Sequence, residues 1–169
     1  MQAQRGFTLV ELAIATLVLL VGVVAVMQLV PAAMQSNLRN RYDTTAMVVA
    51  QRLLDQMMSQ SIDLTQFTNA DGQPIQLGGS ATQTYGGPVV AVNRVARINF
   101  NAGVAGVSGY NFVYVDPDDP ARVRYEVRYA VIVVTQGGVV ASKRFIVGAW
   151  RRDARQVSPP VTVEGWLQR

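Results

Sequence analysis

The feature of this sequence that most limits its fold is a continuous apolar segment over residues 7–30. A run of about 20 apolar residues is long enough to cross the hydrocarbon core of a bilayer as a helix. Within the segment, Glu11 is the one ionisable side chain. A carboxylate in a membrane helix is costly and by default marks a functional position. The segment therefore predicts a helix that is long and apolar enough to span a membrane and that does not contribute to the core of a soluble domain.

Two general explanations of this segment are a cleaved secretory signal and a plain membrane anchor. Residues 30–32, Val-Pro-Ala, could serve as a small-residue cleavage site. The apolar region of a secretory signal spans about 7–15 residues, however, and this one is longer and contains an acid. A plain anchor is compatible with the length but leaves Glu11 unexplained.

A third explanation comes from residues 6–11, which read Gly-Phe-Thr-Leu-Val-Glu and follow a short polar leader containing Arg5. This order, with a membrane-length apolar run directly after it, resembles the prepilin-type cleavage and methylation motif of the type IV pilin-like family. The specific resemblance covers residues 5–58.

The resemblance implies roles for three residues. A prepilin peptidase would cleave after Gly6 at the cytoplasmic face of the inner membrane and methylate the new N-terminal residue, Phe7. Glu11 would then pair with the N-terminal amine of a neighbouring subunit during assembly. The implied partners are other pilin subunits, the peptidase, the inner-membrane assembly platform and, before assembly, membrane lipid. The implied location is the inner membrane, crossed once with the globular domain in the periplasm, and then a periplasmic or cell-surface filament.

The pattern changes after Pro31, which is expected to kink or loosen the helix because proline lacks a backbone N–H. From there to Met58, apolar residues recur every three or four positions, which predicts an amphipathic continuation of the helix. Residues 35–169 should accordingly form a soluble folded domain. The predicted apolar face consists of Met34, Leu38, Tyr42, Ala46, Val49, Leu53 and Met57.

The predicted organisation is a leader (1–6), a transmembrane or filament-core helix (7–30), its amphipathic continuation (31–60) and a β-rich domain (61–169). We expect residues 61–88 to be an irregular connection, because they are rich in Gly, Thr, Gln and Asn. Strands are predicted at 89–100, 110–115, 123–135, 139–151 and 161–163, with a hairpin turn at 135–138. The third strand alternates apolar residues with Arg122, Arg124, Glu126 and Arg128, which predicts one buried and one solvated face. The fold class is α+β, a type IV pilin-like arrangement with the long helix packed on a small antiparallel sheet.

The composition excludes most of the common catalytic groups. The 169 residues include neither cysteine nor histidine, so thiol nucleophiles, thiolate or His-ligated zinc and Ser-His-Asp triads are absent. We therefore expect a protein that is not an enzyme and has no cofactor. The densest acidic group, Asp116, Asp118 and Asp119, offers oxygen ligands that would suit calcium. Its spacing does not match an EF-hand loop, and a proline-set turn explains the same residues.

The net charge is +4, and fourteen of the fifteen basic residues are arginine. The arginines are dispersed and have acids between them, which favours ordinary solvated faces over nucleic-acid binding. If the chain did bind nucleic acid, the side chains available would be Arg122, Arg124, Arg128, Arg151 and Arg152.

The predicted function is that of a structural subunit of a type IV pilus-like filament, acting as a minor pilin in assembly initiation or at the tip. Residues 50–56 and 143–150 resemble the PilV-type minor pilins. The alternatives are a pseudopilin of a type II secretion system and, in another class, a DNA-binding subunit of a competence pilus.

Overall fold

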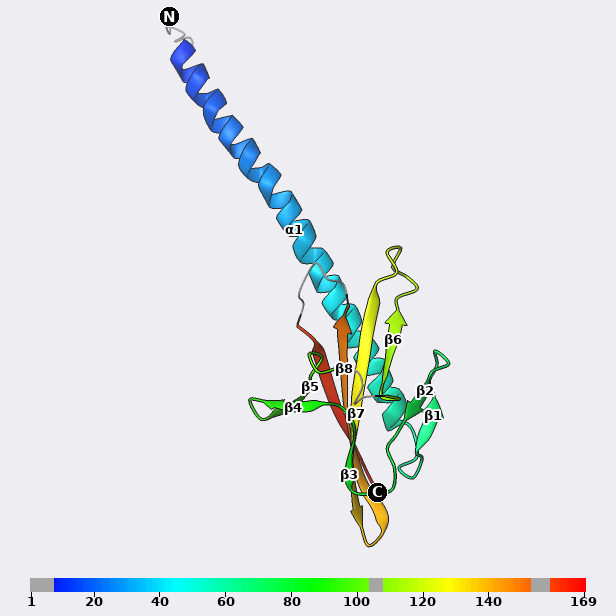
Figure 1. Cartoon of the computed structure of the whole chain (residues 1–169). Coiled ribbons are helices and arrows are strands. Elements are labelled where there is room, and N and C mark those ends of the chain that lie inside the picture. The colour runs from blue at the N-terminus through cyan, green and yellow to red at the C-terminus, as the bar shows by residue number, and fades with distance from the viewer. Residues whose placement is uncertain (1–7, 104–107, 153–158) are drawn as a thin grey trace, which may run out of the picture. The chain divides into compact units, whose positions relative to one another are not determined.

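The computed structural model describes residues 8–103, 108–152 and 159–169, which fall into two compact units, Met1–Arg41 and Tyr42–Arg169. The helix α1 spans Leu9–Met58. The described part of the chain then holds nine strands (Figure 1), which are β1 (Gln66–Thr68), β2 (Pro74–Gln76), β3 (Gln83–Gly86), β4 (Val89–Val92), β5 (Val95–Ile98), β6 (Asn111–Val115), β7 (Arg124–Gln136), β8 (Val139–Arg151) and β9 (Val161–Gln168). The arrangement confirms the predicted α+β class and its long N-terminal helix.

In the first unit, α1 carries the apolar segment with every described side chain exposed. By length and composition this helix can cross a membrane. Pro31 lies inside it, and α1 is one continuous helix from Leu9 to Met58. The loosening predicted at Pro31 therefore does not divide the helix.

In the second unit, five antiparallel strands form one sheet in the order β3-β7-β8-β9. The remaining strand, β6, pairs with the first half of β7, and β3 pairs with its second half. The two long strands β7 and β8 are joined at Gly137 and Gly138, whose φ angles are 61° and 80°. Both angles are positive, as a tight two-residue hairpin turn requires. The predicted hairpin is thus confirmed.

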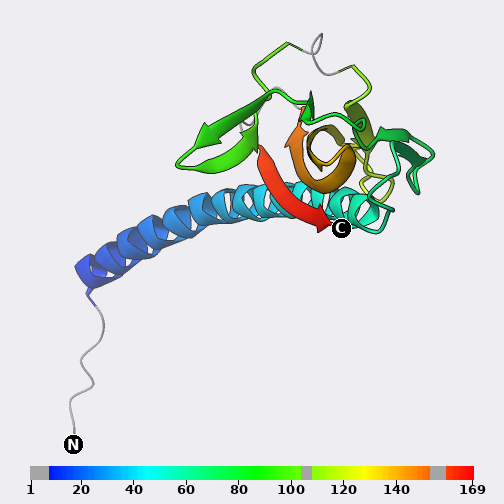
Figure 2. The ribbon, with the colours of Figure 1, turned by 90° about the horizontal axis from the view of Figure 1, so that it is seen from below.

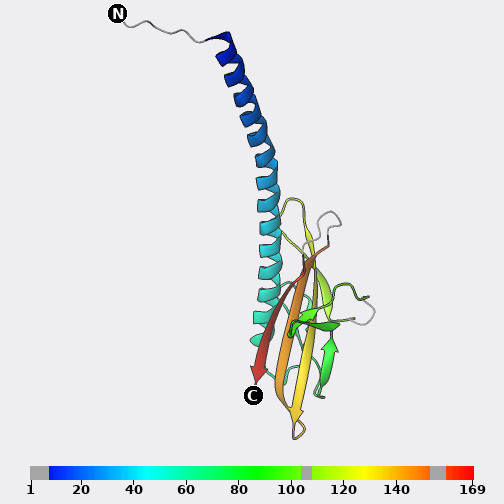
Figure 3. The same cartoon turned by 90° about the vertical axis from the view of Figure 1, so that its left-hand side faces the viewer.

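The C-terminal part of α1 packs against the inner face of this sheet (Figures 2 and 3). The helix contributes Ala46, Val49, Ala50, Leu53, Leu54 and Met57, all of them buried. Alternate residues of the two long strands pack against them: Tyr125, Val127, Tyr129, Val131 and Val133 of β7 and Phe145, Val147 and Ala149 of β8. The predicted apolar helix face is therefore correct from Tyr42 onward, whereas Met34 and Leu38 are exposed.

Glycine allows β9 to lie close to the helix. A Cβ atom at Gly165 would stand 2.5 Å from the Met58 sulfur and 3.1 Å from a Leu54 methyl group. Strand β9 runs to Gln168, so the prediction of a short last strand at 161–163 was wrong. It failed because Gly165 and the polar residues around it conceal a strand that is stabilised by tertiary packing.

The outer face of the sheet also differs from the prediction. The hairpin of β4 and β5 covers part of it, and Ile98 and Phe100 pack on Ala130 and Ile146 as a second core. Gly148 makes this approach possible, since a Cβ there would lie 2.9 Å from both Ile98 and Phe100. Residues 89–100, predicted as one strand, are two, because Asn93 and Arg94 adopt the positive φ angles of a tight turn.

Beneath this hairpin, Glu126 and Arg128 are only 5% and 4% exposed, so the prediction that they are solvated was wrong. Arg128 Nε donates to Glu126 Oε1 over 2.8 Å. Its terminal nitrogen donates to the carbonyl oxygens of Asn99 and Ala102, at 3.2 and 2.8 Å. This buried ion pair fastens the chain after β5 to the outer face of the sheet.

The segment 61–88 is also more regular than predicted. It contains the hairpin of β1 and β2 as well as β3, which extends the main sheet. These strands are three or four residues long, too short to show an alternating pattern that can be recognised in the sequence.

We predict that Arg128→Met destabilises residues 35–169 by about 3–5 kcal/mol, because it leaves Glu126 as an unpaired buried charge. Urea unfolding followed by circular dichroism measures the loss. The control is Arg124→Met, which alters an exposed arginine of the same strand and should change the free energy of unfolding by about 0.5 kcal/mol or less. Equal effects of the two substitutions would contradict the role assigned to the buried pair.

Candidate functional site

The start of α1 joins Thr8 and Glu11 in a reciprocal set of hydrogen bonds. The backbone nitrogen and the hydroxyl of Thr8 donate to Glu11 Oε2 over 3.0 and 3.1 Å. The backbone nitrogen of Glu11 donates to the Thr8 hydroxyl over 3.2 Å. This arrangement is a capping box, which satisfies amide groups that a helix N-terminus otherwise leaves unpaired. The Thr-x-x-Glu spacing was visible in the sequence, but its capping role was not recognised there.

The capping box leaves part of the Glu11 carboxylate available. Both bonds from Thr8 end on Oε2, and within the described residues Oε1 accepts none. An ionised carboxylate has about four acceptor positions on its two oxygens. Glu11 can therefore cap its own helix and still accept a hydrogen bond from a cationic group outside the chain.

The surroundings of Glu11 are apolar and uncovered. Leu9, Val10 and Leu12 are 84%, 67% and 63% exposed, so the chain itself buries none of this surface. Lipid or the helices of other subunits must cover it, because water solvates such a surface poorly. In that setting Oε1 of Glu11, which accepts no bond from the described residues, is a strongly polar feature of the helix start.

The processing residues Gly6 and Phe7 lie outside the described residues. The roles of Gly6 in cleavage and of Phe7 in methylation therefore stay predictions.

The acidic loop after β6 forms turns rather than a cation site. Asp116 Oδ1 accepts the backbone N–H of Asp118 over 3.0 Å, and Asp119 Oδ1 accepts that of Ala121 over 2.8 Å. Within the described ranges, no group of three or more acidic or histidine side chains is placed to hold a metal ion. The structure does not bring Asp116, Asp118 and Asp119 together in the way that the calcium hypothesis required.

The five arginines considered for nucleic-acid binding separate into three environments. Arg128 is buried in the pair with Glu126, which removes it from any binding surface. The guanidinium of Arg151 lies 3.8 Å from the centre of the Tyr42 ring. Arg122, Arg124 and Arg152 line a common open groove.

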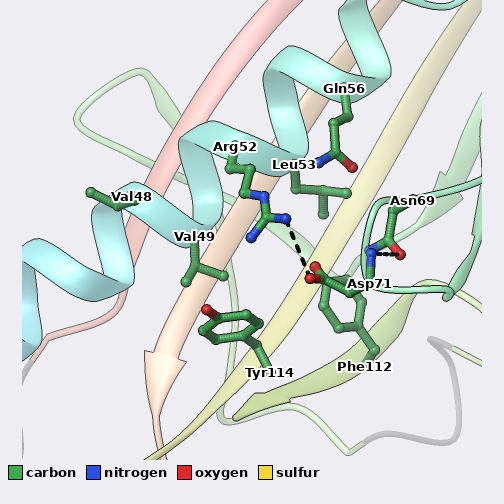
Figure 4. Close-up of a pocket in the computed structure, with 9 residues that line it drawn as sticks. All are labelled: Val48, Val49, Arg52, Leu53, Gln56, Asn69, Asp71, Phe112 and Tyr114. Atoms are coloured by element: carbon green, nitrogen blue, oxygen red, sulfur yellow. Dashed lines mark hydrogen bonds and ion pairs between the residues drawn. The ribbon is translucent and has the colours of Figure 1, made fainter. Parts of the chain in front are cut away.

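A second, much smaller pocket lies between α1, the β1–β2 loop and β6 (Figure 4). Its volume is about 40 Å³, and Arg52 points across it to Asp71 at 3.4 Å. Both side chains are more than a third exposed, so the pair contributes at most about 1 kcal/mol. With a single carboxylate in its lining, the pocket offers no acid and base pair for catalysis.

Lys143, the one lysine of the chain, is unexpectedly buried. Its Nζ donates to the carbonyl oxygen of Leu64 over 2.7 Å and so ties β8 to the segment that follows α1. Burial lowers the pKa of this amine, because desolvation disfavours its charged form. Sequence analysis could not find this contact, which joins residues 79 positions apart.

Residues 1–27 match the family described as the prokaryotic N-terminal methylation motif. No curated protein and no solved structure is significantly similar to the chain.

The exposed apolar part of α1 is consistent with membrane anchoring, and the C-terminal part of α1 packs into a globular domain. The methylation motif at the start of that helix supports a structural subunit of the type IV pilin-like or pseudopilin-like kind. Such a subunit is processed by a prepilin-type peptidase and assembles with other pilin subunits.

We predict that Thr8→Ala frays the start of α1, because the loss of an N-cap costs about 1 kcal/mol. In detergent micelles, hydrogen exchange at the first-turn amides should become about fivefold faster. The matched control is Thr16→Ala, since the Thr16 hydroxyl donates to the Leu12 carbonyl inside the helix, at 2.6 Å, and caps nothing. Unchanged exchange in Thr8→Ala would mean that the capping box does not hold the helix start.

Proposed function

We propose that this chain is a minor pilin of a type IV pilus-like filament, of the PilV type, and acts in assembly initiation or at the filament tip. The observation that carries the proposal is the Glu11 carboxylate, held by Thr8 at the start of an uncovered apolar helix with one oxygen free. A filament of packed helices buries this surface and supplies that oxygen with a partner.

The proposed partner is the N-terminal amine of the neighbouring subunit, formed when a prepilin peptidase cleaves after Gly6. An α-amino group has a reference pKa of about 7.7–8.0 and is largely charged at neutral pH. A carboxylate or an amine buried by itself between apolar helices would have a large desolvation cost, whereas the two charges together form an ion pair. The pairing would also fix the axial register between subunits.

In this proposal the subunit waits in the inner membrane with its globular domain in the periplasm. The assembly platform then moves it into a periplasmic or surface filament. It acts without a cofactor. A type II secretion pseudopilin has the same N-terminal chemistry and is the alternative within this class.

Mass spectrometry of membrane-extracted protein and of sheared filaments tests the processing. The expected N-terminal peptide begins at Phe7, carries an added methyl group and lacks residues 1–6. A mature chain that starts at Ala33 would instead establish a secretory signal. The same spectra measure abundance, and a predominant subunit would contradict the minor role.

Substitutions at Glu11 separate its two roles. Glu11→Gln keeps the capping box, because glutamine also serves at this helix position, but removes the negative charge. We predict that Glu11→Gln and Glu11→Val both leave membrane insertion intact and both block incorporation into filaments. Immunoblots of sheared filaments and of membranes measure the two steps.

The glutamine variant decides between the explanations. If Glu11→Gln assembles normally while Glu11→Val does not, Glu11 acts through helix capping and the amine pairing is wrong.

A further inference from the structure

Three exposed arginines from separate parts of the sequence meet at one end of the sheet. Arg122 ends the loop between β6 and β7, Arg124 begins β7, and Arg152 follows β8. The backbone nitrogen of Arg152 donates to the carbonyl of Arg124 over 3.1 Å, which fixes the last two side by side. Together with Val115, Ala121 and Val123 they line an open groove of about 640 Å³, here called the three-arginine groove.

Among the described residues, no carboxylate neutralises the positive charge of the three-arginine groove. In the ranges that the structure describes, none of the three guanidinium groups forms an ion pair, and no carboxylate belongs to the groove lining. Of the acids nearest in the sequence, Asp116 and Asp119 are 8% and 6% exposed and accept backbone N–H groups of their own loop. Glu126 is buried in its pair with Arg128, and Asp153 lies outside the described residues. The groove therefore presents three cations with open hydrogen-bonding capacity.

The backbone conformation at Arg122 is unusual. Its φ angle is +46°, in the left-handed region that residues with a Cβ atom rarely occupy. Such a conformation costs about 1–3 kcal/mol and persists only where the surrounding structure maintains it. Here two bonds maintain it, from Arg122 N to the Asp119 carbonyl and from Asp116 N to the Val123 carbonyl, at 2.8 and 3.1 Å.

We propose that the three-arginine groove binds the phosphate backbone of duplex nucleic acid. Guanidinium groups pair with phosphate oxygens through two parallel hydrogen bonds and remain charged at all physiological pH values. The groove is open at the surface, so a continuous polyanion can pass through it. Its lining has no aromatic side chain on which bases could stack, and phosphate contacts alone carry no sequence information. Binding is accordingly sequence-independent.

The proposal is tested with the full chain in a neutral detergent and a fluorescently labelled DNA duplex, by polarisation at several salt concentrations. Each phosphate contact contributes about 0.9 to the slope of log affinity against log salt. Replacing all three arginines by glutamine should lower that slope by between two and three and weaken binding at 0.1 M salt by about tenfold or more. Thermal melting followed by circular dichroism checks that the variant is folded.

Two further variants make the result specific. Arg94→Gln with Arg97→Gln removes exposed arginines of the β4–β5 hairpin, outside the groove, and should reduce the slope by less than one. Replacing the three groove arginines by lysine keeps the charge and should restore most of the slope. An equal loss in the hairpin and groove variants would show general charge attraction and overturn the proposal.

Competition identifies the chemistry of the ligand. Unlabelled duplexes of unrelated sequence should displace the probe equally well, and poly-glutamate of equal charge should displace it poorly. Stronger displacement by poly-glutamate would assign the groove to an acidic protein partner. That result, or binding of inorganic phosphate without binding of the duplex, would overturn the nucleic-acid proposal.

Discussion

The packing of one helix face on two long strands is the contact on which the rest of the domain depends. Ala50 and Met57 of α1 are fully buried against alternate residues of β7 and β8, and most other parts of the domain are attached to this pair of layers. Strand β9 can join because Gly165 leaves room beside Met58 and Leu54. The segment after α1 is held by the amine of Lys143. Among the described residues, the apolar first half of α1 has no comparable contact, since all of its side chains are exposed.

The two faces of the sheet are stabilised by different chemistry. The inner face is a continuous apolar core, whereas the outer face combines a small apolar cluster with the buried pair of Glu126 and Arg128. A buried ion pair adds little net stability compared with apolar packing, because both ions must be desolvated. Its geometric effect is greater, since Arg128 binds two carbonyl groups of the chain after β5 and so fixes where the hairpin lies.

The sequence predicted the elements whose pattern is local. The limits of α1, the long hairpin and its two-glycine turn follow from apolar periodicity and turn chemistry, and they agree with the structure. The errors arose where distant residues decide the outcome. Alternating charges on β7 indicate solvent, but Arg128 is buried against the Phe100 ring and the Asn99 and Ala102 carbonyls, which come from another part of the chain. Asn93 and Arg94 form a tight turn without the glycine that normally signals one. At the candidate site, the motif located Glu11, while the groove shared by Arg122, Arg124 and Arg152 required the three-dimensional register of β7 and β8.

The burial of Lys143 has a consequence for the chemical reactivity of the surface. Because all other basic side chains are arginines, the chain offers no exposed lysine. Reagents that acylate primary amines need an accessible nitrogen, and at Lys143 the fold denies that access. In the folded chain such reagents then react chiefly with the α-amino nitrogen. The extent of labelling then reports directly whether that nitrogen is free, modified or covered by another molecule.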